Sequence, residues 1–348
     1  MPGLISRLLR PLVFLASLAL PAAAAAQGLS GAPAPFDEGG VKVALISYIS
    51  GGDFFQAYEA GAKRQAKALG IDLRIFPGRQ DAAQQREQLQ QAIDLGVDGV
   101  ILNHGTPEAL KDLAQQALDA GIAVVAFDVD LGLPKAVQVE QGDAKMARLV
   151  LDRMLADNGP SFTAGYVYVP GFAPLERRDA VWTEVKRANP GIREAARWGV
   201  VDGTTAASVA SQTAAALRAN PGITAIFAPY DEFARGAMLG AQEAGVADRL
   251  RIYSSDISTA DIEAMREPGS PWVATAATNP ASVGEVTVRA AALAIAGEPV
   301  GPRVTVEPVL ITREQLEREN VRSVEDLNAR LPGFARSPAA QAPWIPLP

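Results

Sequence analysis

The chain has 348 residues, 48% of them hydrophobic, a formal net charge of −7 and no cysteine. This length and apolar content are sufficient for a globular protein with a large core and more than one domain. The acidic balance argues against a nucleic-acid partner or a polybasic membrane contact, and the lack of cysteine excludes disulfides, thiol nucleophiles and cysteine-ligated metals.

The N-terminus has the pattern of an export signal. Basic residues precede a short apolar run, Leu12–Leu20, and Ala22–Ala26 offers an Ala-x-Ala cleavage site. The apolar run is short for a membrane span, although an uncleaved anchor helix is the alternative. We expect a signal peptide over residues 1–26, a flexible leader rich in Gly, Pro and Ala over 27–40, and a secreted mature protein that is periplasmic in a cell with an outer membrane.

Strands and helices are expected to alternate from residue 41 onward. Continuous apolar runs of this kind are typical of parallel strands buried on both faces, and amphipathic segments separate them. The alternation predicts an α/β protein with doubly wound parallel sheets. The expected strands are 41–47, 71–76, 97–104, 122–127, 163–169, 195–200, 223–228, 250–254 and 272–276, followed by a long helix over 280–296, an extended run over 304–311 and an irregular tail from Pro332.

Polar residues follow several of these strands. Asn103 and His104 end the third strand, and Asp128 and Asp130 come directly after the fourth. Because ligands bind at the carboxyl ends of strands in open α/β sheets, we expect these side chains to face one crevice. The alternatives are turn or cap chemistry for the acids and a satisfied buried imidazole for His104.

The second half repeats this arrangement. Tyr230 and Asp231 follow one strand and Asp256 follows the next, where each acid is either a ligand contact or a helix cap and Tyr230 either faces the crevice or packs between domains. Arg178 lies near the start of a helix, where the dipole disfavours a cation, so it either donates hydrogen bonds to a ligand or pairs with a neighbouring acid on the surface.

Two adjacent aromatic residues, Phe54 and Phe55, open the first helix. An aromatic face suits the apolar C–H face of a sugar ring, and the alternative is that both rings are core. Asp53 before this pair and Gln56 after it have the spacing of a capping box. No nucleophile elbow, Walker A loop, dinucleotide fingerprint or zinc-protease motif is present, so the sequence favours a binding protein over an enzyme, with no cofactor and no metal.

Taken together, these segments resemble the type I periplasmic binding proteins of ABC sugar transporters, the ribose-binding group, over about residues 41–311. Strings such as Phe-Asp-Val-Asp130 and Asp-Ile-Ser-Thr259 are similar to the methylthioribose-binding-like branch. The markers are Gly-Asp-Phe-Phe55, Val-Asp-Gly-Val-Ile-Leu-Asn103, Val-Val-Ala-Phe-Asp128, Glu-Arg-Arg178, Tyr230-Asp-Glu232 and Asp256.

The resemblance implies two doubly wound lobes joined by a three-crossing hinge near Gln141, Thr278 and Glu307. It implies an N-terminal lobe over 41–141 plus 279–306, a C-terminal lobe over 142–278 plus 307–330, and an irregular tail over 331–348. The ligand positions of the family fall here on Phe54, Phe55, Asn103, Asp128, Arg178, Tyr230, Asp256 and Thr278.

Three of these positions depart from the ribose binders. Those proteins carry Asn where this chain has Tyr230, Arg where it has Val129 and Gln where it has Thr278. The changes remove hydrogen-bonding groups and add apolar surface, which implies a less polar or differently substituted pentose-sized ligand.

By this resemblance the protein captures a sugar-like molecule by hinge closure and delivers it to an ABC transporter permease, its one contact with the membrane. A ligand-sensing subunit for a chemoreceptor or sensor kinase is the alternative function. Presentation of both lobes to a permease favours a monomer.

Overall fold

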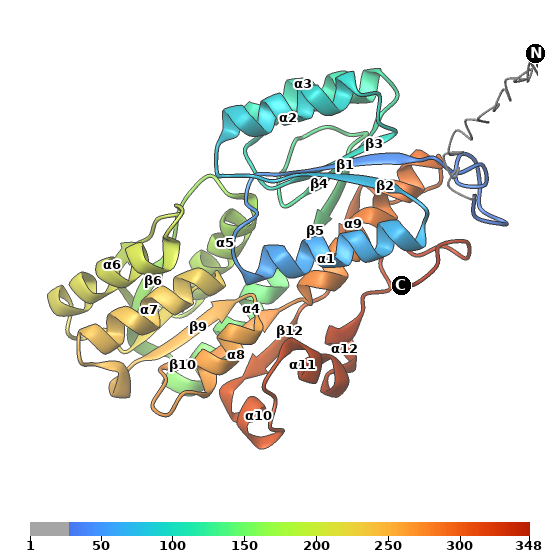
Figure 1. Ribbon diagram of the computed structural model, residues 1–348. Coiled ribbons are helices and arrows are strands. Elements are labelled where there is room, and N and C mark those ends of the chain that lie inside the picture. The colour runs from blue at the N-terminus through green and yellow to red at the C-terminus, as the bar shows by residue number, and fades with distance from the viewer. Residues whose placement is uncertain (1–27) are drawn as a thin grey trace, which may run out of the picture.

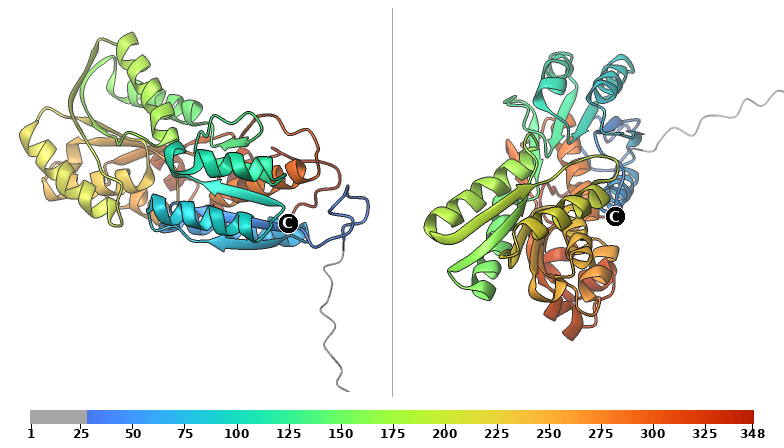
Figure 2. Two further views of the ribbon diagram at one scale, coloured as in Figure 1. Left: turned by 90° about the horizontal axis from the view of Figure 1, so that it is seen from above. Right: turned by 90° about the vertical axis from the view of Figure 1, so that its left-hand side faces the viewer.

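The computed structural model describes residues 28–348, so the expected signal peptide lies outside the described residues. The described chain forms two six-stranded sheets, each enclosed by helices (Figure 1). None of the helices within this range is long and apolar enough to cross a membrane. The two sheets belong to two lobes, which Figure 2 shows as separate bodies.

The first lobe contains a wholly parallel sheet with the strand order β11-β5-β4-β3-β1-β2. Helices α1 and α9 cover one face of this sheet, and α2 and α3 cover the other. Its elements are β1 (Lys42–Ser47), α1 (Asp53–Ala68), β2 (Asp72–Phe76), α2 (Ala82–Asp94), β3 (Gly99–Asn103), α3 (Pro107–Asp119), β4 (Ala123–Phe127), β5 (Val137–Glu140), α9 (Pro280–Ile295) and β11 (Arg303–Thr305).

The second lobe repeats the order as β12-β10-β9-β8-β6-β7, parallel except for the antiparallel edge strand β12. Together the two lobes confirm the predicted doubly wound α/β fold. The elements of the second lobe are α4 (Asp143–Asn158), β6 (Ser161–Val167), α5 (Ala173–Ala188), β7 (Gly191–Trp198), α6 (Thr205–Ala219), β8 (Ala225–Ala228), α7 (Asp231–Glu243), η1 (Ala247–Arg249), β9 (Arg251–Ser255), α8 (Thr259–Arg266), β10 (Trp272–Ala277), β12 (Val309–Thr312), α10 (Arg313–Arg318), α11 (Val324–Arg330) and α12 (Pro332–Ala335).

The central strands form where the sequence is continuously apolar. Every residue of β3 and β8 is buried, as expected for strands covered by helices on both faces. Asn279 caps α9 by accepting the backbone N–H groups of Ala281 and Ser282. The capping box expected at Asp53 does not form, because α1 begins at Asp53 itself, the N-cap is Gly52 and its φ of 90° suits glycine.

The extended run expected over 304–311 is two strands in different sheets. β11 pairs with β5 in the first lobe and β12 pairs with β10 in the second, so the chain passes between the lobes after Thr305. Glu307 and Pro308 separate the two strands, at the crossing that the family resemblance places near Glu307.

The two terminal segments pack together on the first lobe. In the segment expected as a flexible leader, Phe36 is buried, and its ring centroid lies 5.0 Å from that of Trp344. The tail, expected to be irregular, contains the short helix α12 and then buries Ile345 in the core of the first lobe. The C-terminus consequently lies beside this lobe (Figure 2).

Candidate functional site

A small cavity lies between the lobes, at the carboxyl ends of strands from both sheets. Ligand sites of α/β proteins lie at this edge of the sheet. Six of the predicted site residues line it: Phe54, Phe55, His104, Arg178, Tyr230 and Asp256. The remaining lining residues are Ile49, Gln141, Phe172, Pro174, Leu175 and Val201.

Arg178 and Asp256 form the charged side of the cavity. Arg178 Nη1 donates to Asp256 Oδ2 at 3.2 Å and to the Pro229 carbonyl at 2.7 Å, and Nε donates to Asp143 Oδ1 at 2.8 Å. Burial disfavours the charge on Arg178, but the Asp256 and Asp143 carboxylates outweigh it and raise its pKa. The Arg178 side chain is therefore a fixed cation that is only 3% exposed.

The second oxygen of Asp256 has no partner. Asp256 Oδ1 is buried and accepts no hydrogen bond from any of the described residues, although the carboxylate lines the cavity. A buried acceptor without a donor is costly, and a hydroxyl group of a ligand in the cavity would supply one. Burial, opposed by Arg178 and reinforced by Asp143, raises the pKa of Asp256.

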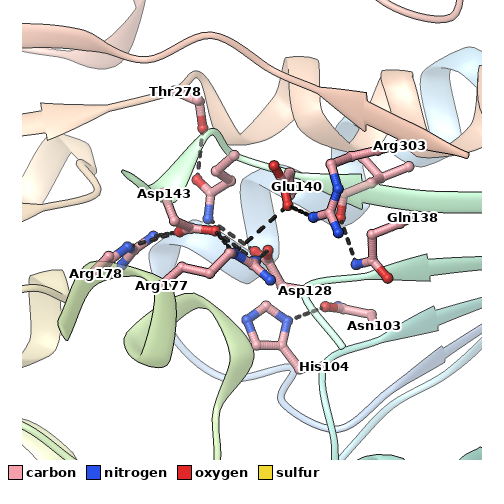
Figure 3. A network of polar contacts seen from close by, with 12 residues as sticks. Asn103, His104, Asp128, Gln138, Glu140, Asp143, Arg177, Arg178, Thr278 and Arg303 are labelled. Atoms are coloured by element: carbon pink, nitrogen blue, oxygen red, sulfur yellow. Dashed lines mark hydrogen bonds and ion pairs between the residues drawn. The ribbon is translucent and has the colours of Figure 1, made fainter. Parts of the chain in front are cut away.

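Asp128 is directed at protein groups and does not line the cavity. Its Oδ1 accepts from Arg177 Nη2 at 2.8 Å, and its Oδ2 accepts from Gln141 Nε2 at 3.3 Å (Figure 3). Thr278 lies behind Gln141, with its hydroxyl donating to Gln141 Oε1 at 2.7 Å. Burial and the neighbouring Asp143 carboxylate raise the pKa of Asp128, and the two arginines oppose this shift.

His104 is held between aromatic rings on the first lobe. It meets Phe55 and Phe127 edge-on, with ring centroids 5.3 Å away in both cases, and its Nδ1 lies 2.7 Å from Asn103 Oδ1. Burial lowers the pKa of His104 to about 3, so the imidazole is neutral at physiological pH. Asn103 is fully buried, does not line the cavity and also donates to Ser47 Oγ at 3.3 Å.

Aromatic and aliphatic side chains from both lobes form the rest of the wall. Phe54 and Phe55 pack edge-to-face at 5.2 Å, and Tyr230 packs edge-to-face on Phe233 at 5.2 Å. Phe172 was not singled out from the sequence, although it stands in the Gly-Phe-Ala-Pro segment that leads into the Arg178 helix. Its position in a loop that leads from a strand into a helix, like that of Phe54 after β1, could have identified Phe172 as a cavity residue.

Like Asn103, Asp128 and Thr278, two further predicted residues do not line the cavity. Asp130 is exposed and accepts the backbone N–H of Gly132 at 3.1 Å, which is turn chemistry. Asp231 is buried at the first position of α7, where its Oδ1 accepts the N–H of Glu232 at 2.8 Å. Across residues 28–348, no group of three or more His, Cys, Asp or Glu side chains is placed to hold a metal ion.

Direct contacts also join the two lobes. The Tyr48 and Phe172 ring centroids are 6.3 Å apart, and Gln80 Nε2 donates to the Asp202 carbonyl at 3.2 Å. Two α/β lobes that enclose a cavity at their strand ends, lined by both charged and apolar side chains, have the arrangement of a small-molecule binding protein.

The chain belongs to the periplasmic binding protein domain family, whose model matches residues 43–299. A 5-methylthioribose transporter solute-binding protein from Thermotoga lettingae, crystallised with 5-methylthioribose, is 36% identical; the match covers 88% of this chain and 95% of that one, with a TM-score of 0.85. This confirms the family resemblance seen in the sequence.

Two further relatives agree with this placement. A sugar ABC transporter protein from Yersinia enterocolitica is 28% identical, with a TM-score of 0.86 and coverage of 91% of this chain and 97% of that one. The ribose import binding protein of Salmonella typhimurium is 25% identical over 288 residues, which are 78% of this chain and 90% of the relative. The family consists of binding proteins.

Proposed function

We propose that this protein captures a pentose-type sugar with an apolar substituent and delivers it to the permease of an ABC transporter. The observation that carries the proposal is the mixed lining of the cavity. Asp256 Oδ1 lacks a donor and Arg178 presents a fixed cation, which suits sugar hydroxyl groups. Phe172, Leu175 and Val201 line the same cavity and offer apolar surface to a substituent.

The relatives support this ligand class and this role. The Thermotoga lettingae protein was crystallised with 5-methylthioribose, a pentose that carries a methylthio group. All three relatives are named as transport or import proteins, which favours delivery to a permease over the alternative of a sensing subunit. Export by a cleaved signal peptide, a periplasmic location and a monomeric state belong to the same proposal.

Ligand binding in this proposal requires movement of two lobes about the segments that join them. The lobes comprise residues 41–141 plus 279–306 and residues 142–278 plus 307–330. The packing of α9 on the first sheet, with β11 in that sheet and β12 in the second, supports this division. Hinges near Gln141, Thr278 and Glu307 let the lobes close on the sugar, and no chemistry is done on it.

Titration calorimetry of the mature chain from Gln27 with 5-methylthioribose and D-ribose tests the proposal. We expect 5-methylthioribose to bind more tightly. Asp256→Asn removes the unpaired acceptor and should weaken both sugars, whereas Leu175→Ala removes apolar wall and should weaken 5-methylthioribose alone. Failure of both sugars, and of other pentoses and polyols, to bind the folded protein would reject the proposed ligand class.

A further inference from the structure

Arg177 and Arg178 are neighbours on α5, yet they connect different parts of the molecule. Every donor of Arg178 that forms a hydrogen bond goes to the second lobe: to Asp143, to the Pro229 carbonyl and to Asp256. Arg177 instead bridges the two lobes. Its Nη2 lies 2.6 Å from Asp143 Oδ2 in its own lobe and donates at 2.8 Å to Asp128 Oδ1, which follows β4 in the other lobe.

Asp128 depends on this contact from the opposite lobe. Its side chain is fully buried, and Arg177 is the cation within ion-pair distance of it among residues 28–348. The other Asp128 oxygen accepts a hydrogen bond from the uncharged side-chain amide of Gln141. The residue that follows, Val129, is buried in the core of the first lobe and supplies no charge. A buried carboxylate without a paired cation is strongly unfavourable.

Separation of the lobes would break the bridge. Arg177 moves with α5 and Asp143, whereas Asp128 moves with β4, so the ion pair exists only when the lobes are together. Arg177 also lies 3.7 Å from Glu140, the last residue of β5, which adds a second acid of the first lobe to the same guanidinium. The ion pairs of Arg177 therefore favour the closed arrangement over the open one.

We propose that Arg177 is a positioning residue that holds the two lobes closed by bridging Asp128 and Asp143. It does not line the cavity, so it acts on ligand affinity through the lobe equilibrium and not by touching the sugar. The proposal rests on the hinge closure of the proposed function.

The test measures the distance between the lobes without any sugar. Because the chain has no cysteine, Gln116→Cys on α3 and Ala215→Cys on α6 place one spin label on an exposed site of each lobe without background labelling. Distance distributions are recorded for this parent, for Arg177→Gln and for Arg177→Lys, at low and high salt. We expect Arg177→Gln to move the population toward longer distances, and Arg177→Lys, which keeps the charge, to restore part of the short-distance population.

Arg235→Gln is the matched control. Arg235 pairs at 2.6 Å with the fully buried Asp261, and its side chain is 28% exposed against 22% for Arg177, but this pair lies within the second lobe. We expect it to lower thermal stability without shifting the distance distribution. Identical distributions for the parent and Arg177→Gln at both salt concentrations would overturn the proposal, as would an equal shift in Arg235→Gln.

A second measurement addresses the link to ligand binding. With 5-methylthioribose as the probe, we expect Arg177→Gln to weaken affinity by roughly tenfold, the scale of one lost charge-assisted contact. If the parent binds neither 5-methylthioribose nor D-ribose, the proposed ligand fails while the spin-label distances still decide the role of Arg177. A mutant that binds as tightly as the parent and keeps its short distances rejects the role itself.

Discussion

At the scale of single residues, the backbone at three strand ends turns the same way. His104, Asp128 and Asp256 follow β3, β4 and β9, and their φ angles are 60°, 54° and 72°. Residues with a side chain rarely adopt this left-handed region. In each case the amide still donates to the neighbouring strand segment, to Phe127, Val139 and Ala276 respectively, which anchors the turn. Such strain concentrates at functional sites, where it re-aims a side chain.

The neutral, buried state of His104 makes stability depend on pH. The folded pKa of about 3 lies below the unfolded value of 6.5, so the unfolded chain binds a proton first as pH falls. The stabilisation is present above pH 6.5 and is lost as pH falls toward 3. Between pH 7 and pH 5 the linkage amounts to about 2 kcal/mol.

His104→Asn isolates this effect, because asparagine tolerates the left-handed backbone and does not titrate. We expect the free energy of unfolding in urea to fall by about 2 kcal/mol more in the wild type than in the variant between pH 7 and pH 5. The chain has one histidine, so no other imidazole contributes. Parallel pH profiles for the two proteins would contradict the burial argument.

At the scale of elements, the C-terminal tail provides hydrogen-bond acceptors for a buried arginine of α9. Arg289 on α9 is fully buried, and its guanidinium donates to the carbonyls of Ser337 and Ala339 and to Gln65 Oε1. Burial lowers the pKa of Arg289 to about 10, although the Glu285 carboxylate opposes the shift. The tail thus supplies the acceptors that a buried cation requires.

Deletion of residues 337–348 should therefore destabilise the first lobe by more than its lost apolar contacts. In the wild-type background we expect a lower midpoint of thermal unfolding, with Arg289 left short of acceptors at a cost of about 1–3 kcal/mol. In an Arg289→Met background the same deletion should cost less. A double-mutant cycle compares the two, and strictly additive losses would show that Arg289 does not depend on the tail.

At the scale of the whole molecule, neither lobe is built from one continuous stretch of chain. The first sheet takes β11, and its helical layer takes α9, from sequence that follows most of the second lobe. The tail then returns from Phe334 in the second core to Ile345 in the first. Unfolding one lobe releases segments that constrain the other, so the two should unfold together.

Scanning calorimetry of two core truncations checks this cooperativity. Leu45 in β1 and Ile252 in β9 are both fully buried, one in each lobe. We expect a single unfolding transition in each variant, at a lower temperature than in the wild type. The free energy of unfolding should fall by roughly 2–5 kcal/mol in Leu45→Ala and in Ile252→Ala, as is typical of such cavities. Two resolved transitions, each sensitive to one variant alone, would show instead that the lobes unfold independently.

Local sequence patterns were sufficient for the strands, most helices and the edge of the sheets where the cavity lies. Apolar runs that end in polar residues predict buried parallel strands with a crevice at their carboxyl ends, because that rule depends only on local hydrophobicity and chain direction. His104 and Asp256 were placed in this way, and Arg178 by its position near the start of a helix; the structure brings all three to the cavity wall.

Only the tertiary structure decided which groups the predicted site residues contact. The direction of Asp128 toward Arg177 and Gln141 and the solvent exposure of Asp130 have no local signal. The direction of Asp128 depends on a group distant in sequence, because the cation that pairs with this buried charge lies on the other lobe. The sequence by itself determined the elements and the family, and the packing of two lobes determined which charges meet.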